Sequence, residues 1–354
     1  MLDVDQTLDA LQRYDRGVVD GDKAVVVALM KDLLDGGAEP LDVLIGVIAA
    51  AQRTIGDRWQ RGEWSVAQEH AATAMAMAAT EIVARSVAQT PITRGHIIVT
   101  CAEREWHWLP AAIIDCALRS DGWQTTQLGP ATSPLRFSQY IQDLGPDAVA
   151  VSCSVLGALP TTRRFIEAST SAGVPAIVGG AAFGSDDVRA KALGATAWAP
   201  DARRAVEAAA GLPVVVPAVA PLPEATAQEL AALDWDHLRL VDQVRRQWVV
   251  TSPTKADAAQ AAVRAVARDG VPHALHAVSA ALLTGDPRTV SETATWFAAL
   301  LACRGVDAHS AVDELTEVLI AALLDYPLSV DLVRSHFSVT NVDLTHAIGP
   351  KAWG

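Results

Sequence analysis

The sequence predicts a multidomain protein of the α and α/β classes, with a doubly wound parallel sheet between two helical regions. Apolar residues recur at helical spacing up to about residue 90, and again from 228 to 346. Between them, short runs rich in β-forming residues alternate with helical stretches. A chain of 354 residues is long enough for two or three such domains. The expected divisions are a helical bundle at 1–92, a sheet domain at 93–213, a linker at 214–227 and an all-α domain at 228–354.

Four helices are expected in the first region. Glycines near positions 21, 36 and 62 interrupt the helical pattern and divide it into separate stretches. Ser65 is suited to cap the last helix, which is predicted from about Val66 to Val87. Helices joined by such short connections are typical of a four-helix bundle.

The second region predicts a flavodoxin-like sheet of five parallel strands. Right-handed crossovers between successive β-α units favour the strand order 2-1-3-4-5. In that order a ligand binds at the switch point, beyond the carboxyl ends of strands 1 and 3. The predicted strands are His96–Ala102, Gln124–Leu128, Ala148–Ser154, Ala176–Val178 and Thr196–Ala199.

Three loops at this edge of the sheet carry candidate site residues. His107 follows the first strand, two residues after Glu105, so a carboxylate is available to orient an imidazole that binds a metal. The end of strand 3 and the loop after it carry residues 152–157. The loop after strand 4 contains Gly179-Gly180, where a bulky ligand can approach the backbone. Taken alone, such a histidine is more often a solvated or structural loop residue, and such a glycine pair is more often a tight βα turn.

Composition excludes several classes of protein. The net charge is −13 and basic residues do not cluster, which argues against a nucleic-acid partner. The N-terminus is acidic and unlike a signal peptide, and the longest apolar run, residues 43–51, is too short to span a membrane. The four cysteines show no CxxC spacing, so we expect reduced core thiols, Cys303 included, in a cytoplasmic protein.

Beyond the sheet, several prolines in 213–223 predict a semi-rigid linker. About six helices are expected after it, with ends near Gly270, Gly285 and Gly305 and another helix before Pro327.

Three motifs follow the predicted helical bundle in order: Glu-x-His at 105–107, Ser-x-Leu at 154–156 and Gly-Gly at 179–180. In this order they resemble the cobalamin-binding modules of methionine synthase and of the adenosylcobalamin photoreceptors. That resemblance, over about residues 10 to 211, implies that His107 is the lower cobalt ligand and that Glu105 orients it. It also implies that the cofactor's displaced nucleotide tail lies in a slot lined by the loops after strands 3 and 4. Pro110 stands where the family has glycine, but proline is tolerated in the first turn of a helix. The cobalamin contacts implied in the sheet domain are Glu105, Trp108, Ser154, Val155, Leu156, Gly179 and Gly180.

The bundle carries a second motif, Trp59 followed by nine residues and then Glu69-His70. It resembles the W-x9-EH motif of the light-sensing branch, in which these groups shelter the adenosyl group above the corrin. A core tryptophan with an exposed Glu-His pair is the alternative interpretation. The light-sensing family often has a histidine directly after the tryptophan, and Gln60 replaces it here.

The C-terminal domain, by its size and position, resembles the globin-like domain of the photocobilins, which binds a bilin such as biliverdin beside cobalamin. His273 and His276 lie three residues apart and would share a helix face. Together with Trp296 they are the candidate bilin contacts. The other histidines and tryptophans of this domain are expected to be surface or core residues: His237, His309, His336, His346, Trp235, Trp248 and Trp353. Because Cys303 follows an apolar stretch, non-covalent bilin binding is expected. The candidate partners for bilin propionates are Arg239, Arg245, Arg246, Arg264 and Arg268.

The resemblance implies a light sensor that is not an enzyme, with adenosylcobalamin and a bilin as its cofactors. The resemblance also implies a homodimer. A downstream protein or enzyme partner is expected because the sequence shows no kinase, cyclase or DNA-binding signature. One alternative is a corrinoid methyl carrier for methyltransferases. Another is a cobalamin sensor whose globin domain holds haem.

Overall fold

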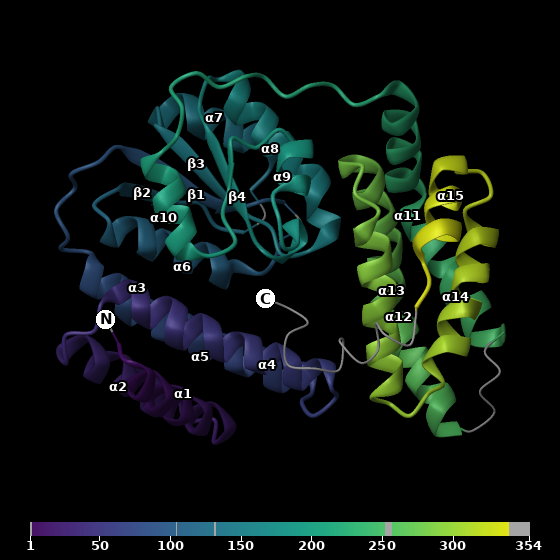
Figure 1. Ribbon diagram of the computed structural model, residues 1–354, viewed down its shortest axis with the longest axis horizontal. Coiled ribbons are helices and arrows are strands. Elements are labelled where there is room, and N and C mark those ends of the chain that lie inside the picture. The colour runs from purple at the N-terminus through teal and green to yellow at the C-terminus, as the bar shows by residue number, and fades with distance from the viewer. Residues whose placement is uncertain (1, 104, 131, 252–256, 340–354) are drawn as a thin grey trace. The chain divides into compact units, whose positions relative to one another are not determined.

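A computed structural model describes residues 2–103, 105–130, 132–251 and 257–339 (Figure 1). His346 and Trp353 lie outside these residues. The chain forms two compact units, one from residues 1–59 with 64–219, the other from 60–63 with the chain after 219. Among the helices of the described residues, none combines the length and the apolar character needed to cross a bilayer.

The first unit begins with four helical stretches, as predicted. A π-helical segment, η1, connects α3 and α4 into one continuous stretch, so five named α-helices make four rods. Ser65 caps the last helix reciprocally: its Oγ accepts from the Gln68 amide at 3.3 Å, and the Gln68 Oε1 accepts from the Ser65 amide at 2.9 Å. The bounds are α1 Val4–Val19, α2 Lys23–Asp35, α3 Pro40–Asp42, η1 Val43–Ala49, α4 Ala50–Gln60 and α5 Val66–Val87. We call these elements the cap.

The cap shares one hydrophobic core with α6 (Trp108–Ser120), the first helix of the sheet domain. Met75 and Val83 of α5 lie in the same cluster as Leu109 and Ile113 of α6. Burial of this continuous apolar surface stabilises α5 beside the loop that precedes α6. The cap is therefore anchored next to the loop that carries His107.

Five parallel strands form the sheet, in the predicted order β2-β1-β3-β4-β5. Helices α6 and α10 cover one face, and α7, α8 and α9 lie on the other (Figure 1). Register places Cys101 of β1 beside Ser152 of β3, and Ser152 beside Gly179 of β4, so these three strands end together. The strands are β1 His96–Cys101, β2 Gln124–Gln127, β3 Ala148–Ser152, β4 Ala176–Gly179 and β5 Ala197–Trp198; the helices between and after them are α7 Pro134–Leu144, α8 Leu159–Ser171, α9 Val188–Ala192 and α10 Ala202–Ala210, with short turns η2 Leu156–Ala158 and η3 Ala181–Phe183.

The segment after α10 has no helix or strand until α11 begins at Glu224, inside the range expected for the linker. Val219 packs on Gly194, where a Cβ would come within 2.7 Å of its side chain. This contact holds the middle of the proline-rich segment against the sheet domain.

The second unit is all-helical, as predicted. Its described residues form five helices rather than six: α11 Glu224–Thr251, α12 Asp257–Thr284, α13 Arg288–Ala302, α14 Ala308–Ala322 and α15 Pro327–His336. Positive-φ glycines at 285 and 305 follow α12 and α13, and Pro327 opens α15.

The expected helix end at Gly270 is wrong. Gly270 lies inside α12, and a Cβ there would stand 2.7 Å from the Phe297 ring, so the glycine permits close packing of α12 on α13. Pro272 also lies inside this helix. A glycine at a helix contact and a glycine at a helix end give the same local sequence signal.

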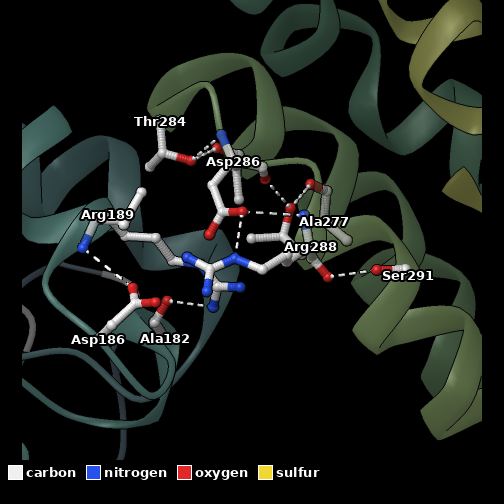
Figure 2. Close-up of polar contacts among 11 residues, drawn as sticks. Ala182, Asp186, Arg189, Ala277, Thr284, Asp286, Arg288 and Ser291 are labelled. Carbon is white, nitrogen blue, oxygen red and sulfur yellow. Dashed lines mark hydrogen bonds and ion pairs between the residues drawn. The ribbon is translucent and has the colours of Figure 1, made fainter. Parts of the chain in front are cut away.

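Polar contacts fix the start of α13. Figure 2 shows the buried Asp286 carboxylate, whose Oδ1 accepts from the Arg288 amide at 3.1 Å and from its Nε at 2.8 Å. The Thr289 hydroxyl donates to the Ala277 carbonyl of α12 at 2.8 Å. The bond to the Arg288 amide satisfies a backbone donor that has no acceptor within α13, and the Thr289 bond ties the start of α13 to α12.

Three of the four cysteines are buried, but the core assignment of Cys303 is wrong. Cys303 is the residue directly after α13 and is exposed. The apolar stretch before it belongs to the buried face of the helix, whereas the helix end turns this thiol outward. The reason given for non-covalent bilin binding therefore no longer holds.

Candidate functional site

His107 stands between β1 and α6, at the N-cap position of α6. Its side chain is 60% exposed. Pro110 occupies the first turn of α6, where a backbone amide has no helical acceptor, so the proline costs the helix no hydrogen bond. No three His, Cys, Asp or Glu side chains converge as a metal cluster within the described residues.

Glu105 binds both the side chain and the backbone of His107. The Glu105 side chain is fully buried, and its Oε1 accepts from both the Nδ1 and the backbone amide of His107, each at 2.7 Å. A neutral imidazole that donates through Nδ1 presents Nε2 as the acceptor for a metal. The carboxylate thus fixes both the ring position and its tautomer.

The second oxygen of Glu105 binds a different loop. Its Oε2 accepts from the amides of Ser154 at 2.5 Å and Val155 at 3.1 Å. Four N–H groups therefore surround one buried carboxylate, which ties the β1–α6 loop to the loop after β3. We call the β1–α6 loop the ligand loop.

This network shifts both ionisable groups in the direction of an ion pair. Burial raises the pKa of Glu105, but the bonds from His107 and Ser154 outweigh it, and the net pKa is lowered. The hydrogen bond to Glu105 raises the pKa of His107, against the opposing effect of burial. The negative charge of Glu69 in the cap adds a smaller effect in the same direction on the pKa of His107.

The cap motif has an ordered part and an exposed part. Glu69 accepts from the Thr73 hydroxyl at 2.8 Å, and that hydroxyl accepts from Gln52 Nε2 at 2.7 Å. His70 is 73% exposed, and its Nδ1 lies 2.7 Å from the Val66 carbonyl. Trp59 is half-buried near the end of α4. Glu69 is thus held by hydrogen bonds within the cap, whereas the ring of His70 is accessible.

Gly179 and Gly180 are required by the protein itself. A Cβ on Gly179 would stand 2.4 Å from the Ala199 carbonyl oxygen. Gly180 has φ +104°, and its Cβ would stand 2.4 Å from the Cys153 carbonyl oxygen. Any larger residue would strain the backbone or displace a neighbouring strand end.

Trp108 lies in a helix and is not part of the exposed loop. It is the first residue of α6, and it is partly buried against the core cluster that includes Ile97 and Ala111. Trp106, on the other side of His107, is the exposed indole of the ligand loop.

Ser152 lies at the same edge of the sheet and is a further candidate site residue, beyond the contacts that the family resemblance implies. It is the last residue of β3, and its buried Oγ has no hydrogen-bond partner in the described structure. Strand register places it next to Gly179. A buried hydroxyl without a partner is costly unless a ligand or water completes it, so this atom fits a polar group entering between the two strand ends. The available signal was its place as the last residue of a fully buried strand.

Arg189 of α9 is buried and contacts the loop after β4. Figure 2 shows its guanidinium reaching the loop after β4, where Nη1 donates to the Ala182 carbonyl at 3.2 Å. It also packs on Gly184, where a Cβ would come within 3.0 Å of Nη1. Because arginines are mostly exposed, sequence alone gives no reason to select a buried one.

The C-terminal candidates lie in an aromatic cluster on three helices. His273 contacts Trp296 edge to face, with centroids 5.5 Å apart. His276 stacks on His237 of α11 at 4.4 Å. His237 was predicted only as a surface or core residue.

Comparison with known protein families identifies the first unit. Residues 10–84 match a B12 binding domain, and residues 95–210 match a second model with the same description. This chain is a B12-binding protein. Its cap and its sheet domain correspond to the two matched segments.

Several solved structures match a little over half of this chain. The monomethylamine corrinoid protein of Methanosarcina barkeri is 19% identical, with a TM-score of 0.50, and the match covers 57% of this chain and 97% of that one. A cobalamin-binding protein from Desulfitobacterium hafniense DCB-2 is 17% identical (TM-score 0.32; 56% and 97% covered). The methanol:cobalamin methyltransferase complex MtaBC of Methanosarcina barkeri is 17% identical (TM-score 0.31; 57% and 78% covered). No curated protein sequence matches significantly.

Replacing Glu105 by glutamine is expected to lower the free energy of unfolding of the cofactor-free protein by about 2–4 kcal/mol at pH 7. An amide has one accepting oxygen, so its NH2 group must face either the two His107 donors or the amides of Ser154 and Val155. Because the pKa of Glu105 is lowered on folding, its contribution is complete above about 4.3 and is lost as the pH falls through the folded value.

Urea unfolding at a series of pH values measures this difference. Glu103→Gln, in the same loop, is the matched control and should change stability little. A deficit of Glu105→Gln that stays constant down to the lowest accessible pH would contradict the assignment.

Proposed function

We propose that the first unit binds an alkylcobalamin with His107 as the lower ligand of cobalt. The observation that carries the proposal is the buried Glu105 carboxylate, which holds Nδ1 of His107 and directs Nε2 away from itself. When bound, the cofactor would supply a cobalt–carbon bond that breaks by light or by alkyl transfer.

The remaining contacts of the cofactor follow from the strand ends. The bare backbone at Gly179-Gly180 and the unpartnered Ser152 hydroxyl fit an aromatic nucleotide tail with polar ring atoms. Leu156 opens η2 directly after the amides that bind Glu105, and would line the same slot. Trp59, Glu69 and His70 would face the upper ligand from the cap.

Methyl-group carriage is one use of this site, and the solved relatives support it. The fold similarity to the monomethylamine corrinoid protein spans nearly all of that chain. In this role the cap would move aside so that a partner methyltransferase reaches the cobalt. This support comes from likeness of fold alone, and one fold can serve many functions.

Light sensing with adenosylcobalamin is the other use, and the cap residues support it. Glu69 and His70 offer hydrogen-bonding groups for a ribose or an adenine, and Trp59 offers a flat apolar surface. A methyl group needs none of these. Gln60 is buried and cannot replace a histidine as a cobalt ligand after photolysis, so His70 or water would take that place.

A bilin such as biliverdin in the second unit would extend this light response. The supporting observation is the cluster of His273, Trp296, His276 and His237, which offers aromatic faces and ring nitrogens. The exposed Cys303 thiol makes a thioether link testable by mass spectrometry. Haem is the competing tetrapyrrole.

Spectra of the reconstituted protein separate these uses. Protein loaded with adenosylcobalamin in the dark should lose its alkylcobalamin bands in green light if it is a sensor, and Trp59→Ala should alter the rate of that loss. Stable bands in light, with transfer of a methyl group from methylcobalamin-loaded protein to a thiol acceptor, would instead establish the carrier. A red band after biliverdin addition supports the bilin, and a Soret band supports haem.

A further inference from the structure

We infer that Thr161 is a positioning residue for the cobalt ligand, and this inference rests on the proposed role of His107. Thr161 belongs to the first turn of α8, far from His107 in sequence, and its side chain is buried. Its hydroxyl lies 2.8 Å from the carbonyl oxygen of Glu103, in the ligand loop.

This bond is unusual for a threonine in a helix. Helical threonines ordinarily donate back to a carbonyl three or four residues earlier, and Thr161 has that option in Ala158, at 2.9 Å. A hydroxyl has one proton, so the two carbonyls share it. The helix therefore gives up part of a local bond to hold a loop that belongs to another strand.

Thr161 and Glu105 together fix the ligand loop at two points. Glu105 grips the amides of Ser154 and Val155 at the start of the connection between β3 and α8. Thr161 donates to the Glu103 carbonyl from the first turn of α8, just beyond that connection. Two attachments restrain rotation of the loop, whereas Glu105 alone would act as a pivot.

The consequence is a link between the tail slot and the cobalt ligand. The segment from Ser154 to Thr161 contains Leu156, which is proposed to line the slot for the nucleotide tail, and both ends of the segment bind the ligand loop. A displacement of the first turn of α8 therefore moves His107. Loss of the Thr161 bond should allow the imidazole to depart from the cobalt axis without disturbing its bond to Glu105.

The neighbouring Thr162 provides a matched control. Its side chain is also buried, and its hydroxyl donates to the same Ala158 carbonyl at 2.9 Å. It is also hydrogen-bonded to the thiol of Cys153. Among the described residues of the ligand loop, none is hydrogen-bonded to the Thr162 hydroxyl. Thr161→Val and Thr162→Val remove one buried hydroxyl each from the same turn, without changing side-chain shape.

The test uses full-length protein loaded with cob(II)alamin and labelled with 15N-histidine. Thr161→Val should weaken cobalamin binding about tenfold and reduce the fraction of cobalt whose electron paramagnetic resonance spectrum responds to the label. Thr161→Ser should restore both, and Thr162→Val should stay within about twofold of the unmodified protein. In cofactor-free protein, amide hydrogen exchange in the ligand loop should rise in Thr161→Val alone.

Equal behaviour of Thr161→Val and Thr162→Val in binding, spectrum and exchange would overturn the inference while leaving the role of His107 intact. An unmodified protein whose spectrum ignores the label, and matches that of His107→Ala, would overturn the proposed ligand and this inference with it.

Discussion

Replacing His107 by alanine is expected to abolish the histidine-ligated state of bound cobalamin and to weaken cobalamin binding more than a hundredfold. Loss of a residue that merely orients a metal ligand typically costs 10–100-fold in affinity, and loss of the ligand itself should cost more. Alanine also leaves the buried Glu105 carboxylate without the Nδ1 donor at 2.7 Å. Binding is measured by titration with cobalamin, and ligation by the spectrum of 15N-histidine-labelled protein.

His70→Ala is the matched control for this experiment. His70 is the imidazole of the cap motif and is exposed, with its Nδ1 close to Glu69 and to the Val66 carbonyl. Its removal should leave the lower ligand unchanged. If His70→Ala lost the histidine-ligated spectrum and His107→Ala kept it, the assignment of the ligand would be reversed.

The strand order and the place of His107 could be predicted because both follow from local sequence and general topology. Five β-α units with right-handed crossovers leave few arrangements, and the observed order β2-β1-β3-β4-β5 is the predicted one. The carboxyl ends of β1, β3 and β4 then meet at one edge. Glu105 and His107, two residues apart, needed no tertiary information to be paired.

Contacts between distant residues could not be predicted in this way. Glu105 binds amides about fifty positions later, and Thr161 binds a carbonyl 58 positions earlier. Backbone donors and acceptors have no sequence signature, because every residue carries them. The unpartnered hydroxyl of Ser152 likewise depends on what surrounds it in the folded protein.

Gly180→Ala is expected to destabilise the protein by about 3 kcal/mol and to weaken cobalamin binding by about tenfold or more. The backbone at Gly180 has φ +104°, which an alanine adopts only with strain, and its Cβ would lie 2.4 Å from the Cys153 carbonyl oxygen. That carbonyl cannot retreat freely, because it accepts from the Ala182 amide at 3.2 Å. Relief of the overlap must displace Cys153, and with it the Ser154 amide that binds Glu105. The damage should therefore reach the cobalt ligand as well as the tail slot.

Gly129→Ala separates this effect from a general intolerance of the domain for alanine. Gly129 is exposed in the loop after β2, and a Cβ there would meet nothing within 4 Å. Denaturant unfolding followed by circular dichroism, with cobalamin titration beside it, should show Gly129→Ala close to the unmodified protein and Gly180→Ala far below it. If the two variants unfolded at the same denaturant concentration, the backbone at Gly180 would have to adopt another conformation in solution. The close approach of β4 to the end of β3, on which the proposed slot depends, would then be lost.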